Sequence, residues 1–414
     1  MTYGCIGGKL SHSFSKEIHN LIADYDYELK ELSPREVEGF ISSRNFSAVN
    51  VTIPYKETVI PYIDEIDESA ALIGAVNTVV NKDGRLFGYN TDFYGMSELL
   101  SRAGICPSGK KVLILGTGGT AKTAAAVCNF LGAKEIIKAS RSENKGGVLY
   151  ADVYKYHTNS EIIINTTPVG MYPSISGSPI DITKFPLLCG VIDAVYNPLK
   201  TSLILDAEKR GLPAIGGLYM LVSQAVKASE HFLGATYREA ITDEIYSKVL
   251  KQKTNLVLIG MPSCGKSSVG RIIANILGRE FIDTDDIITE RFGSIKAIFE
   301  ERGEDEFRKI ESAIIEEVSA KSGVVIATGG GSVIKCENVY SLKKNGSIYF
   351  IDRPLSMLIS TPDRPLSTTQ DGLDKLYRKR ISIYKECADV IIDGAESPQN
   401  IARKAISTFL ENTI

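Results

Sequence analysis

Short apolar runs alternate along the chain with stretches whose apolar residues recur at helical spacing. The runs are four to six residues long and rich in Val, Ile and Leu, which is typical of strands buried on both faces. Strands that alternate with helices predict an α/β fold with mainly parallel sheets. The clearest predicted strands are 111–115, 161–165, 190–195, 255–260, 323–328 and 347–352.

The helical pattern also suggests where domains meet. The stretch 236–250 is expected to be a helix, and a short polar segment, 251–255, follows it before a new strand begins. A weaker boundary lies near Gly104, after another helical stretch. We therefore predict domains at 1–103, 104–250 and 254–414, with the last helices of the second domain returning to the first.

Composition excludes several function classes. The 414 residues carry a formal net charge of −3, whereas a general nucleic-acid binder is usually basic. We find no apolar run long enough for a membrane span and no leader pattern at the N-terminus. The seven cysteines are widely spread, without a Cys-x-x-Cys pair, so we expect a reduced cytoplasmic protein without zinc. A homodimer is compatible with the sequence.

The segment "KVLILGTGGTAKT" joins a predicted strand to a predicted helix through a glycine-rich turn. Such a turn lets the backbone approach a pyrophosphate at a helix N-terminus, although many α/β folds contain a similar turn. Arg141, about twenty residues further on, suits a ribose 2′-phosphate and favours NADP(H) over NAD. The candidate cofactor residues are Gly116, Gly118, Gly119, Thr120, Ala121, Arg141 and Lys145.

Four polar clusters precede this loop: "SHSFS" (11–15), "NVTIPYK" (50–56), "GAVNT" (74–78) and "GYNTD" (88–92). Each cluster follows an apolar stretch, where functional groups collect, but turns and helix caps use the same residue types. A lysine near an aspartate can transfer a proton to a substrate oxygen while hydride moves at carbon.

In these motifs, and in "NTTPVGM", "DAVYNPLKT" and "GGLYMLVSQA" further on, residues 1 to about 250 resemble the shikimate dehydrogenase family. The resemblance implies a substrate domain followed by a Rossmann-type NADP domain. It also implies reduction of 3-dehydroshikimate, with Lys56 and Asp92 as the catalytic pair. The substrate-binding residues that it implies are Ser13, Ser15, Asn50, Thr52, Asn77 and Gln224.

A second loop, "GMPSCGKSS", has the spacing of a nucleoside-triphosphate loop between a strand and a helix. Its backbone N–H groups would surround phosphates, Lys266 would reach the outer phosphates, and Ser267 would bind Mg²⁺. Downstream, Asp283 and Asp285 are expected on one face of an extended segment. The candidate ATP residues are Gly260, Gly265, Lys266, Ser267 and Ser268, and the candidate metal ligands are Ser267 and Asp283.

Further motifs follow in the order "FRKIE", "ATGGGS", "DRPLS" and "RKRISIY". With this order, residues 254–414 resemble the shikimate kinase family and its nucleoside monophosphate kinase-like fold. The resemblance implies that Lys266, Asp285 and Arg364 act in catalysis, with Arg364 as part of a lid. Substrate would be bound by Asp285, Arg308, the triplet Gly329, Gly330 and Gly331, and Arg380.

The sequence therefore predicts one enzyme with two activities, which use NADP(H), ATP and Mg²⁺ on 3-dehydroshikimate and shikimate. Two alternatives remain open: one half is a regulatory module without catalysis, or the first half also oxidises quinate. Cys264, inside the second loop, is either a small residue tolerated there or a reactive thiol beside Lys266.

Overall fold

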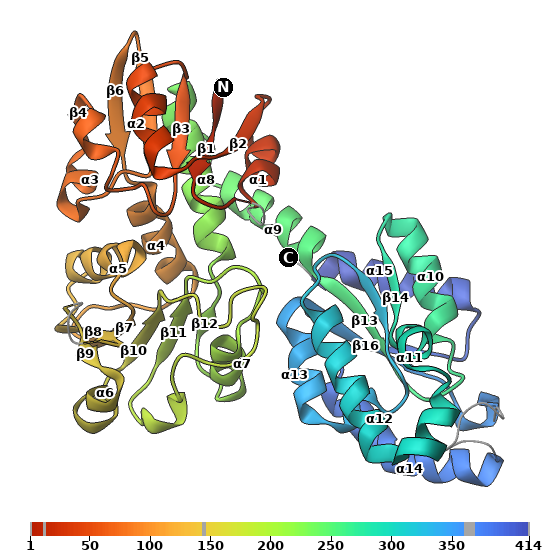
Figure 1. Cartoon of the computed structure of the whole chain (residues 1–414). Coiled ribbons are helices and arrows are strands. Elements are labelled where there is room, and N and C mark those ends of the chain that lie inside the picture. Colours follow the sequence, from red (N-terminus) through yellow and green to blue (C-terminus); the bar gives the residue numbers. More distant parts are fainter. Residues whose placement is uncertain (1, 11–13, 143–145, 360–368, 413–414) are drawn as a thin grey trace. The chain divides into compact units, whose positions relative to one another are not determined.

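The computed structural model describes residues 2–10, 14–142, 146–359 and 369–412. By its internal contacts the chain divides into two compact units. The first unit comprises 1–197 and 201–249, and the second comprises 198–200 and 250–414. Within the described residues the strands form three sheets, two of them in the first unit (Figure 1).

The first sheet has the strand order β2-β1-β3-β5-β6-β4. Strand β1 pairs in parallel with β2 and β3, whereas β5 is antiparallel to both β3 and β6. Asp83 and Gly84 both have positive φ (52° and 84°), which suits a tight hairpin between β5 and β6. The elements are β1 (Tyr3–Gly7), α1 (Ser15–Ile22), β2 (Tyr27–Glu31), α2 (Pro34–Ser43), β3 (Ala48–Val51), β4 (Glu65–Ile66), α3 (Glu68–Ile73), β5 (Thr78–Lys82), β6 (Arg85–Tyr89) and α4 (Thr91–Arg102).

The second sheet is parallel throughout, in the order β12-β11-β10-β7-β8-β9. Strand β7 (Lys111–Leu115), inside this sheet, is apolar on both faces: Val112 and Ile114 enter one core, and Leu113 and Leu115 enter another. The elements are β7 (Lys111–Leu115), α5 (Gly119–Phe130), β8 (Glu135–Ser140), β9 (Val148–Leu149), α6 (Tyr150–Tyr156), β10 (Ile162–Asn165), β11 (Gly190–Asp193), α7 (Ser202–Lys209), β12 (Ala214–Ile215), α8 (Leu218–Leu233) and α9 (Ile241–Lys253).

Helices α4 and α8 pack along each other and run from the first sheet of this unit to the second (Figure 1). Their contact is close at Gly95, where an added Cβ would lie 2.6 Å from Gln224 Cγ and 2.8 Å from the Met220 carbonyl oxygen. Helix α8 ends at Gly234, whose φ of 62° is readily adopted by glycine. The two sheets of the first unit are thus joined by a pair of tightly packed helices.

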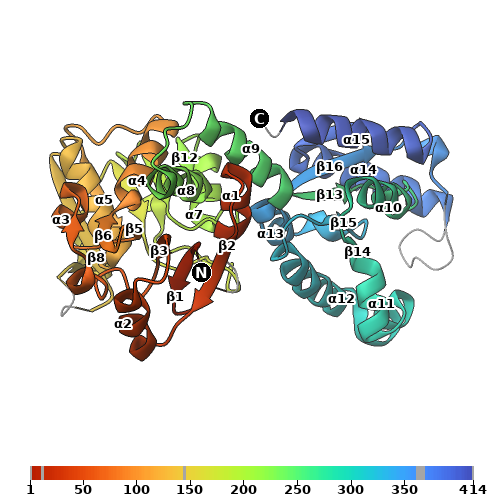
Figure 2. The same ribbon diagram turned by 90° about the horizontal axis from the view of Figure 1, so that it is seen from above.

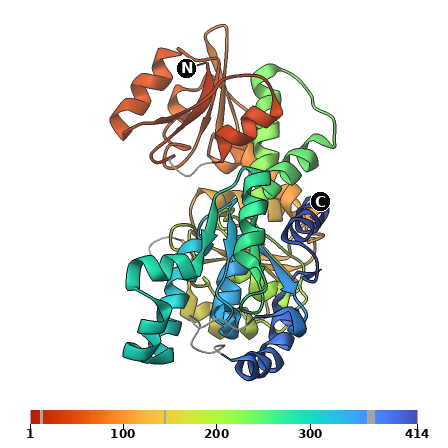
Figure 3. The same ribbon diagram turned by 90° about the vertical axis from the view of Figure 1, so that its right-hand side faces the viewer.

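The third sheet belongs to the second unit and is also parallel, in the order β14-β15-β13-β16-β17. Helices α10 and α15 pack together on one face and α12 and α13 on the other (Figures 2 and 3). The elements are β13 (Asn255–Ile259), α10 (Lys266–Leu277), β14 (Phe281–Asp283), α11 (Thr284–Phe292), α12 (Ile295–Ser319), β15 (Val325–Ala327), α13 (Cys336–Asn345), β16 (Gly346–Asp352), α14 (Gln370–Cys387), β17 (Val390–Asp393) and α15 (Pro398–Asn412).

The predicted α/β fold class is confirmed, and each of the six predicted strands overlaps an observed one. The helix expected to end at residue 250 extends further, because the first three residues of the polar segment 251–255 complete helix α9, which ends at Lys253. Lysines in the last turn of a helix are favourable to its dipole, so a polar sequence there continues the helix. The three-domain assignment stays a prediction. Among the described helices, none combines the length and the apolar character that a membrane crossing needs.

We expect Gly217→Ala to destabilise the first unit, because the added methyl group would lie 2.2 Å from the Ala194 carbonyl oxygen. The backbone must shift to relieve this overlap, which should lower the free energy of unfolding by about 1–3 kcal/mol. Hydrogen exchange of α8 peptides in increasing urea measures this loss.

The matched control is Gly39→Ala within α2, where an added Cβ meets nothing within 4 Å. Alanine there should stabilise the helix by about 0.5–1 kcal/mol. Equal stability of the two variants would contradict the steric argument.

Candidate functional sites

Lys56 and Asp92 form a close ion pair in the first unit. The Nζ of Lys56 lies 2.5 Å from Oδ2 of Asp92, and the two side chains are 19% and 6% exposed. Lys56 follows strand β3, and Asp92 lies in the first turn of α4. The side chain of Asn90 caps that helix by accepting hydrogen bonds from the N–H groups of Asp92 and Phe93. The cap therefore fixes where the aspartate points.

Asn77 holds the other oxygen of Asp92. Its Nδ2 donates to Asp92 Oδ1 at 2.9 Å and to Thr91 Oγ1 at 3.1 Å, and its Oδ1 accepts the Thr91 N–H at 2.8 Å. Both hydrogens of the Asn77 amide are thus used within the protein. The sequence brought Lys56, Asp92 and Asn77 forward as separate clusters, and the structure places them together.

Asn50, at the end of β3, is connected to the same network. Its Oδ1 accepts a hydrogen bond from the Tyr27 hydroxyl at 2.6 Å, and its Nδ2 donates to Thr78 Oγ1 at 3.1 Å. The ring of His19 stacks on Tyr27 at 3.9 Å, and its Nδ1 lies 2.5 Å from the Tyr25 hydroxyl. Burial lowers the pKa of His19 to about 3, so this imidazole is neutral in the folded protein. Tyr27 had no sequence signal, because β2 and β3 flank β1, and Tyr27 meets Asn50 only when the sheet is assembled.

The other predicted substrate residues lie around this network. Ser15 begins α1, and Thr52 lies against Gly7, where an added Cβ would be 2.5 Å from the Thr52 methyl group. Gln224 of α8 covers Gly95, one turn beyond Asp92 on α4. Ser13 lies outside the described residues.

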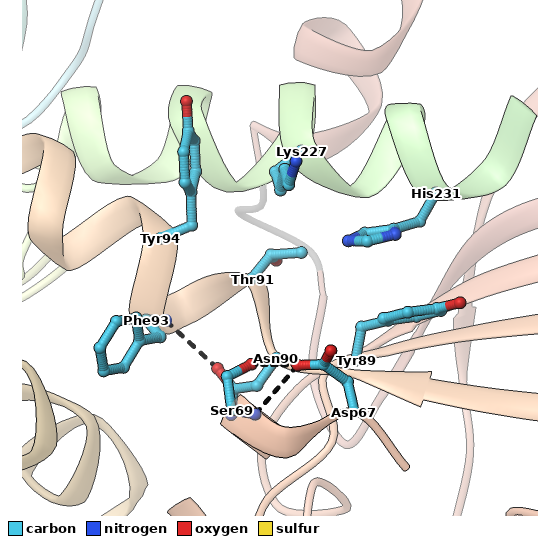
Figure 4. A pocket seen from close by; sticks show the side chains of 9 residues that line it. All are labelled: Asp67, Ser69, Tyr89, Asn90, Thr91, Phe93, Tyr94, Lys227 and His231. Atoms are coloured by element: carbon cyan, nitrogen blue, oxygen red, sulfur yellow. Dashed lines mark hydrogen bonds between the residues drawn. The ribbon is translucent and has the colours of Figure 1, made fainter. Parts of the chain in front are cut away.

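A cavity of about 160 Å³ lies beside the start of α4 (Figure 4). Helix α8 contributes Lys227 and His231 to its wall, and His231 stacks on Tyr89 at 3.9 Å. Burial lowers the pKa of His231. No sequence motif pointed to Lys227 or His231, whereas Tyr89 belongs to the "GYNTD" cluster.

The glycine-rich turn after β7 has the conformation that its sequence predicts. Gly116 has a φ of +114°, and a Cβ there would lie 2.7 Å from Thr166 Oγ1, so only glycine fits. At Gly118 and Gly119 an added Cβ meets nothing within 4 Å, so the backbone at the N-terminus of α5 faces open space. Thr120 is half-buried and Ala121 is fully buried against the sheet. This geometry suits a pyrophosphate.

A cavity of about 480 Å³ adjoins this turn and includes Arg141. The Ser140 hydroxyl donates to the Ser142 carbonyl at 2.9 Å and so closes its own turn. Lys145 lies outside the described residues. Sequence reasoning quoted part of the remaining wall in "NTTPVGM" and in the glycine-rich turn without assigning these residues to the cofactor, because the wall is assembled from several segments: Thr117, Ser142, Tyr150, Thr166, Thr167, Pro168, Val169, Ser178 and Pro179.

The second loop runs from Gly260 to Gly265, which have φ values of +145° and +98°. The ammonium of Lys266 donates to the carbonyl oxygens of Gly260 at 3.0 Å and Met261 at 2.9 Å. It also lies 3.8 Å from the sulfur of Cys264, which has no exposed surface. The loop therefore wraps around the lysine at the start of α10, where Ser268 follows Ser267.

The Ser267 hydroxyl donates to Asp283 Oδ2 at 2.6 Å, so the two predicted metal ligands are adjacent. The expectation that Asp283 and Asp285 share an extended segment is wrong. Asp283 ends β14 and caps α11, with Oδ1 accepting the Asp285 N–H at 3.0 Å. Because an aspartate at the end of a strand is also a good helix cap, Asp285 lies in the first turn of α11.

The glycine triplet packs closely among predicted site residues. An added Cβ at Gly329 would lie 2.6 Å from Asp285 Oδ1, and one at Gly331 would lie 2.3 Å from Arg308 Nη1. The Gly330 carbonyl accepts hydrogen bonds from Arg380 Nη1 at 3.0 Å and from the Tyr384 hydroxyl. The Gly329 N–H donates to Thr284 Oγ1 at 3.1 Å, so this backbone donor is already used within the protein. Glycine is needed here for close packing.

Arg308 itself is an almost buried cation between two glutamates. Its Nη1 lies 2.7 Å from Glu311 Oε2, and its Nη2 lies 3.0 Å from Glu304 Oε1. Burial alone would lower the pKa of Arg308, but the charges of Glu311 and Glu304 outweigh this effect and raise it. Glu311 ends the quoted "FRKIE" motif but was given no role from the sequence, and Glu304 was not singled out. Arg364 lies outside the described residues.

Comparisons with known proteins give a separate result for each part of the chain. A family model described as the shikimate dehydrogenase substrate binding domain matches residues 5–79, and one described as shikimate kinase matches residues 262–410. A shikimate dehydrogenase (NADP(+)) of Clostridium perfringens is 38% identical over 268 residues. This match covers 60% of the chain and 97% of the relative.

Solved structures resemble the same part. A chorismate mutase/shikimate 5-dehydrogenase fusion protein from Clostridium acetobutylicum matches with a TM-score of 0.57 and 34% identity, over 60% of this chain and 96% of that one. A shikimate 5-dehydrogenase from Thermus thermophilus, solved in complex with NADP(H) and shikimate, matches with a TM-score of 0.54 and 28% identity. The match covers 99% of that chain and 60% of this one.

Acid should destabilise the first unit through His19. The folded-state pKa of about 3 lies below the ordinary value of 6.5, so stability is present above pH 6.5 and is lost as the pH falls towards 3. Between pH 6.5 and 5 this single group should cost about 2 kcal/mol. Urea unfolding followed by hydrogen exchange of α1 and β2 peptides measures the slope against pH.

His19→Phe retains a ring that can stack on Tyr27 but removes the titration, so its slope should be shallower by about one proton. Tyr25→Phe, the control, keeps the imidazole and should keep the slope. Identical slopes in the wild type and His19→Phe would rule out His19 as the source.

Proposed function

The chain belongs to the shikimate dehydrogenase family over its first part and carries a shikimate kinase domain after it, and we propose that it catalyses two consecutive reactions. The first unit reduces 3-dehydroshikimate to shikimate with NADPH, and the second phosphorylates shikimate with ATP and Mg²⁺ to give shikimate 3-phosphate. Polar groups assembled for chemistry in each unit support this most directly: the Lys56–Asp92 pair in the first and Ser267 beside Asp283 in the second.

In the first unit Lys56 is the proton donor to the substrate oxygen. Its ammonium is more exposed than the Asp92 carboxylate, which lies 2.5 Å from it. NADPH supplies the hydride when it is bound. Lys56 gives its proton to the substrate oxygen as hydride adds to the carbon, which gives an alcohol. The neutral amine then takes a proton from water, and Asp92 holds the amine in place for the next turnover.

The amide and hydroxyl groups around this pair suit a small ring acid that carries hydroxyls. Asn50, Thr52, Ser15 and Gln224 bind substrate in this proposal, with Ser13 as a further residue implied by the family. Both amide hydrogens of Asn77 are taken by Thr91 and Asp92. We therefore propose that Asn77 chiefly holds Asp92 in place. Asn77 would contact the substrate only by giving up one of these two hydrogen bonds for one to the substrate.

The cavity beside α5 fits NADP. Open backbone at Gly118 and Gly119 accommodates the pyrophosphate, and Arg141 in the cavity wall pairs with the 2′-phosphate. Lys145 adds positive charge in the proposal. Thr120 and Ala121 complete the turn, because a small residue at 121 lets α5 lie close to the sheet.

The second unit fits a triphosphate and a divalent cation. Ser267 and Asp283 offer oxygen ligands, which Mg²⁺ prefers, and Lys266 reaches the outer phosphates. Backbone N–H groups from Gly260 to Ser268 surround the phosphates. Asp285 orients the acceptor hydroxyl, and Arg364 stabilises the transferred group. Arg308 and Arg380, with the glycine triplet between them, bind the substrate carboxylate and hydroxyls.

We also propose a cellular location, partners and an oligomeric state for this enzyme. All seven cysteines are free, which supports a reduced cytoplasmic location. We propose that the protein acts on small-molecule substrates and has no nucleic-acid or membrane partner. The homodimer stays a prediction, which the mass of the particle in solution tests.

Lys56→Ala and Lys266→Ala separate the two activities. Lys56→Ala should lower NADP-dependent shikimate oxidation by about 100-fold or more and leave ATP-dependent phosphorylation nearly unchanged. Lys266→Ala should do the reverse, because it removes a charge from the transferring phosphates. Both assays are run on the full chain, so each variant is the control for the other. A wild-type chain active in one assay only would favour a regulatory role for the silent half.

Arg141→Asp should weaken NADPH more than NADH, because it replaces a 2′-phosphate partner by a repelling charge. The KM for NADPH is expected to rise about tenfold or more, with a much smaller effect on NADH. Arg238→Asp, which changes an exposed arginine of the same unit, is the control. Equal losses for both cofactors would exclude Arg141 as the 2′-phosphate residue. Oxidation of quinate by the wild type tests the remaining alternative substrate.

A further inference from the structure

Arg308 is bound on two edges by carboxylates of its own helix. Nη1 donates to Glu311 Oε2 at 2.7 Å on one side. On the other, Nε and Nη2 both donate to a single oxygen, Glu304 Oε1, at 3.3 and 3.0 Å. The Nη1–Nη2 end of the guanidinium lies against Gly331, where an added Cβ would be 2.3 Å from Nη1 and 2.6 Å from Nη2. The bidentate position left to a ligand carboxylate is therefore the Nε–Nη2 edge, where Glu304 lies.

The two glutamates differ in how firmly they are held. Glu311 is 1% exposed and also accepts the Ser332 hydroxyl at 2.7 Å, so its position is fixed. Glu304 is 48% exposed, and its carboxylate pairs with Arg308 alone among the residues that the structure describes. Glu304 is therefore the side chain that solvent or a ligand can replace.

The backbone beside Glu304 supports such a replacement. Helix α12 is interrupted at Gly303, which has φ 81° and ψ 168°, and an added Cβ there meets nothing within 4 Å. Glu304 is the first residue after this break, so it is not constrained by a continuous helix on its N-terminal side. Glu311 has no such freedom, because it lies two turns inside the second segment.

We propose that Glu304 is a specificity-determining residue that occupies the substrate-carboxylate edge of Arg308. The Nε and Nη2 hydrogens point in parallel and form the bidentate edge that a carboxylate prefers. Two carboxylates cannot share that edge without repulsion, so a substrate carboxylate binds by displacing Glu304. This inference rests on the proposed role of Arg308 in binding shikimate.

Displacement of Glu304 by the substrate carboxylate predicts a result that a purely structural role of this residue does not. A neutral group at position 304 competes less with an anionic ligand, so affinity for shikimate should rise. Affinity for a ligand without the negative charge should hardly change. If Glu304 instead only oriented Arg308, its loss would weaken both ligands.

The test is Glu304→Gln in the full chain, with Glu306→Gln as the matched control. Glu306 is on the same helix and pairs with Lys309 at 3.0 Å on the surface. ADP formation is measured without NADP, with shikimate and with shikimate methyl ester, which has the same ring but no carboxylate charge. KM and kcat are determined separately for each compound and for ATP.

We expect Glu304→Gln to lower the KM for shikimate about two- to fivefold, as for loss of a partly exposed charge pair. The KM for the methyl ester, the KM for ATP and the kcat should stay within error, and Glu306→Gln should match the wild type. A higher KM for shikimate, an unchanged one, or an equal fall for both compounds would overturn the proposal. Absence of shikimate phosphorylation in the wild type would instead contradict the proposed function.

Discussion

Close approach of backbone to polar side chains, possible only at glycine, is the constraint on which these sites depend. Gly95 lets Gln224 of one helix lie over the helix that carries Asp92. At Gly116 an added Cβ would lie 2.7 Å from Thr166 Oγ1. Gly331 brings backbone against the Arg308 guanidinium in the same way. In each case a methyl group would push apart two elements that hold functional groups in register.

Buried charges add a second constraint, because each must be paired inside the protein. Lys56 and Asp92 pair with each other, and Asn77 satisfies the remaining oxygen of Asp92. Lys266 is satisfied by two carbonyl oxygens of its own loop. Arg308 is satisfied by two glutamates. A ligand at any of these cations binds by exchange, so affinity reflects the difference between two sets of contacts rather than the new contacts alone.

Much of the fold could be predicted from sequence because its signals are local. The apolar run 111–115 and the glycine turn after it predict a strand and a helix start without knowledge of distant residues. The position of Asp285 was predicted wrongly because the choice between an extended segment and a capped helix depends on one hydrogen bond to Asp283. Tyr27 could not be found, since it meets Asn50 only when β1, β2 and β3 assemble into one sheet. Glu311 stands in the quoted "FRKIE", but its contact with Ser332 comes from a distant segment.

Cys264 shows how a loop residue can be determined by the core beneath it. Its side chain has no exposed surface and belongs to the apolar core of the second unit. A reactive thiol needs access to its reagent, so burial favours the packing interpretation. Its sulfur lies 2.9 Å from the position that a Cβ of Gly260 would occupy, and the Ile351 carbonyl oxygen lies 3.0 Å from the same point. The cysteine thus fills the space that glycine at position 260 leaves, and its own presence makes glycine necessary there.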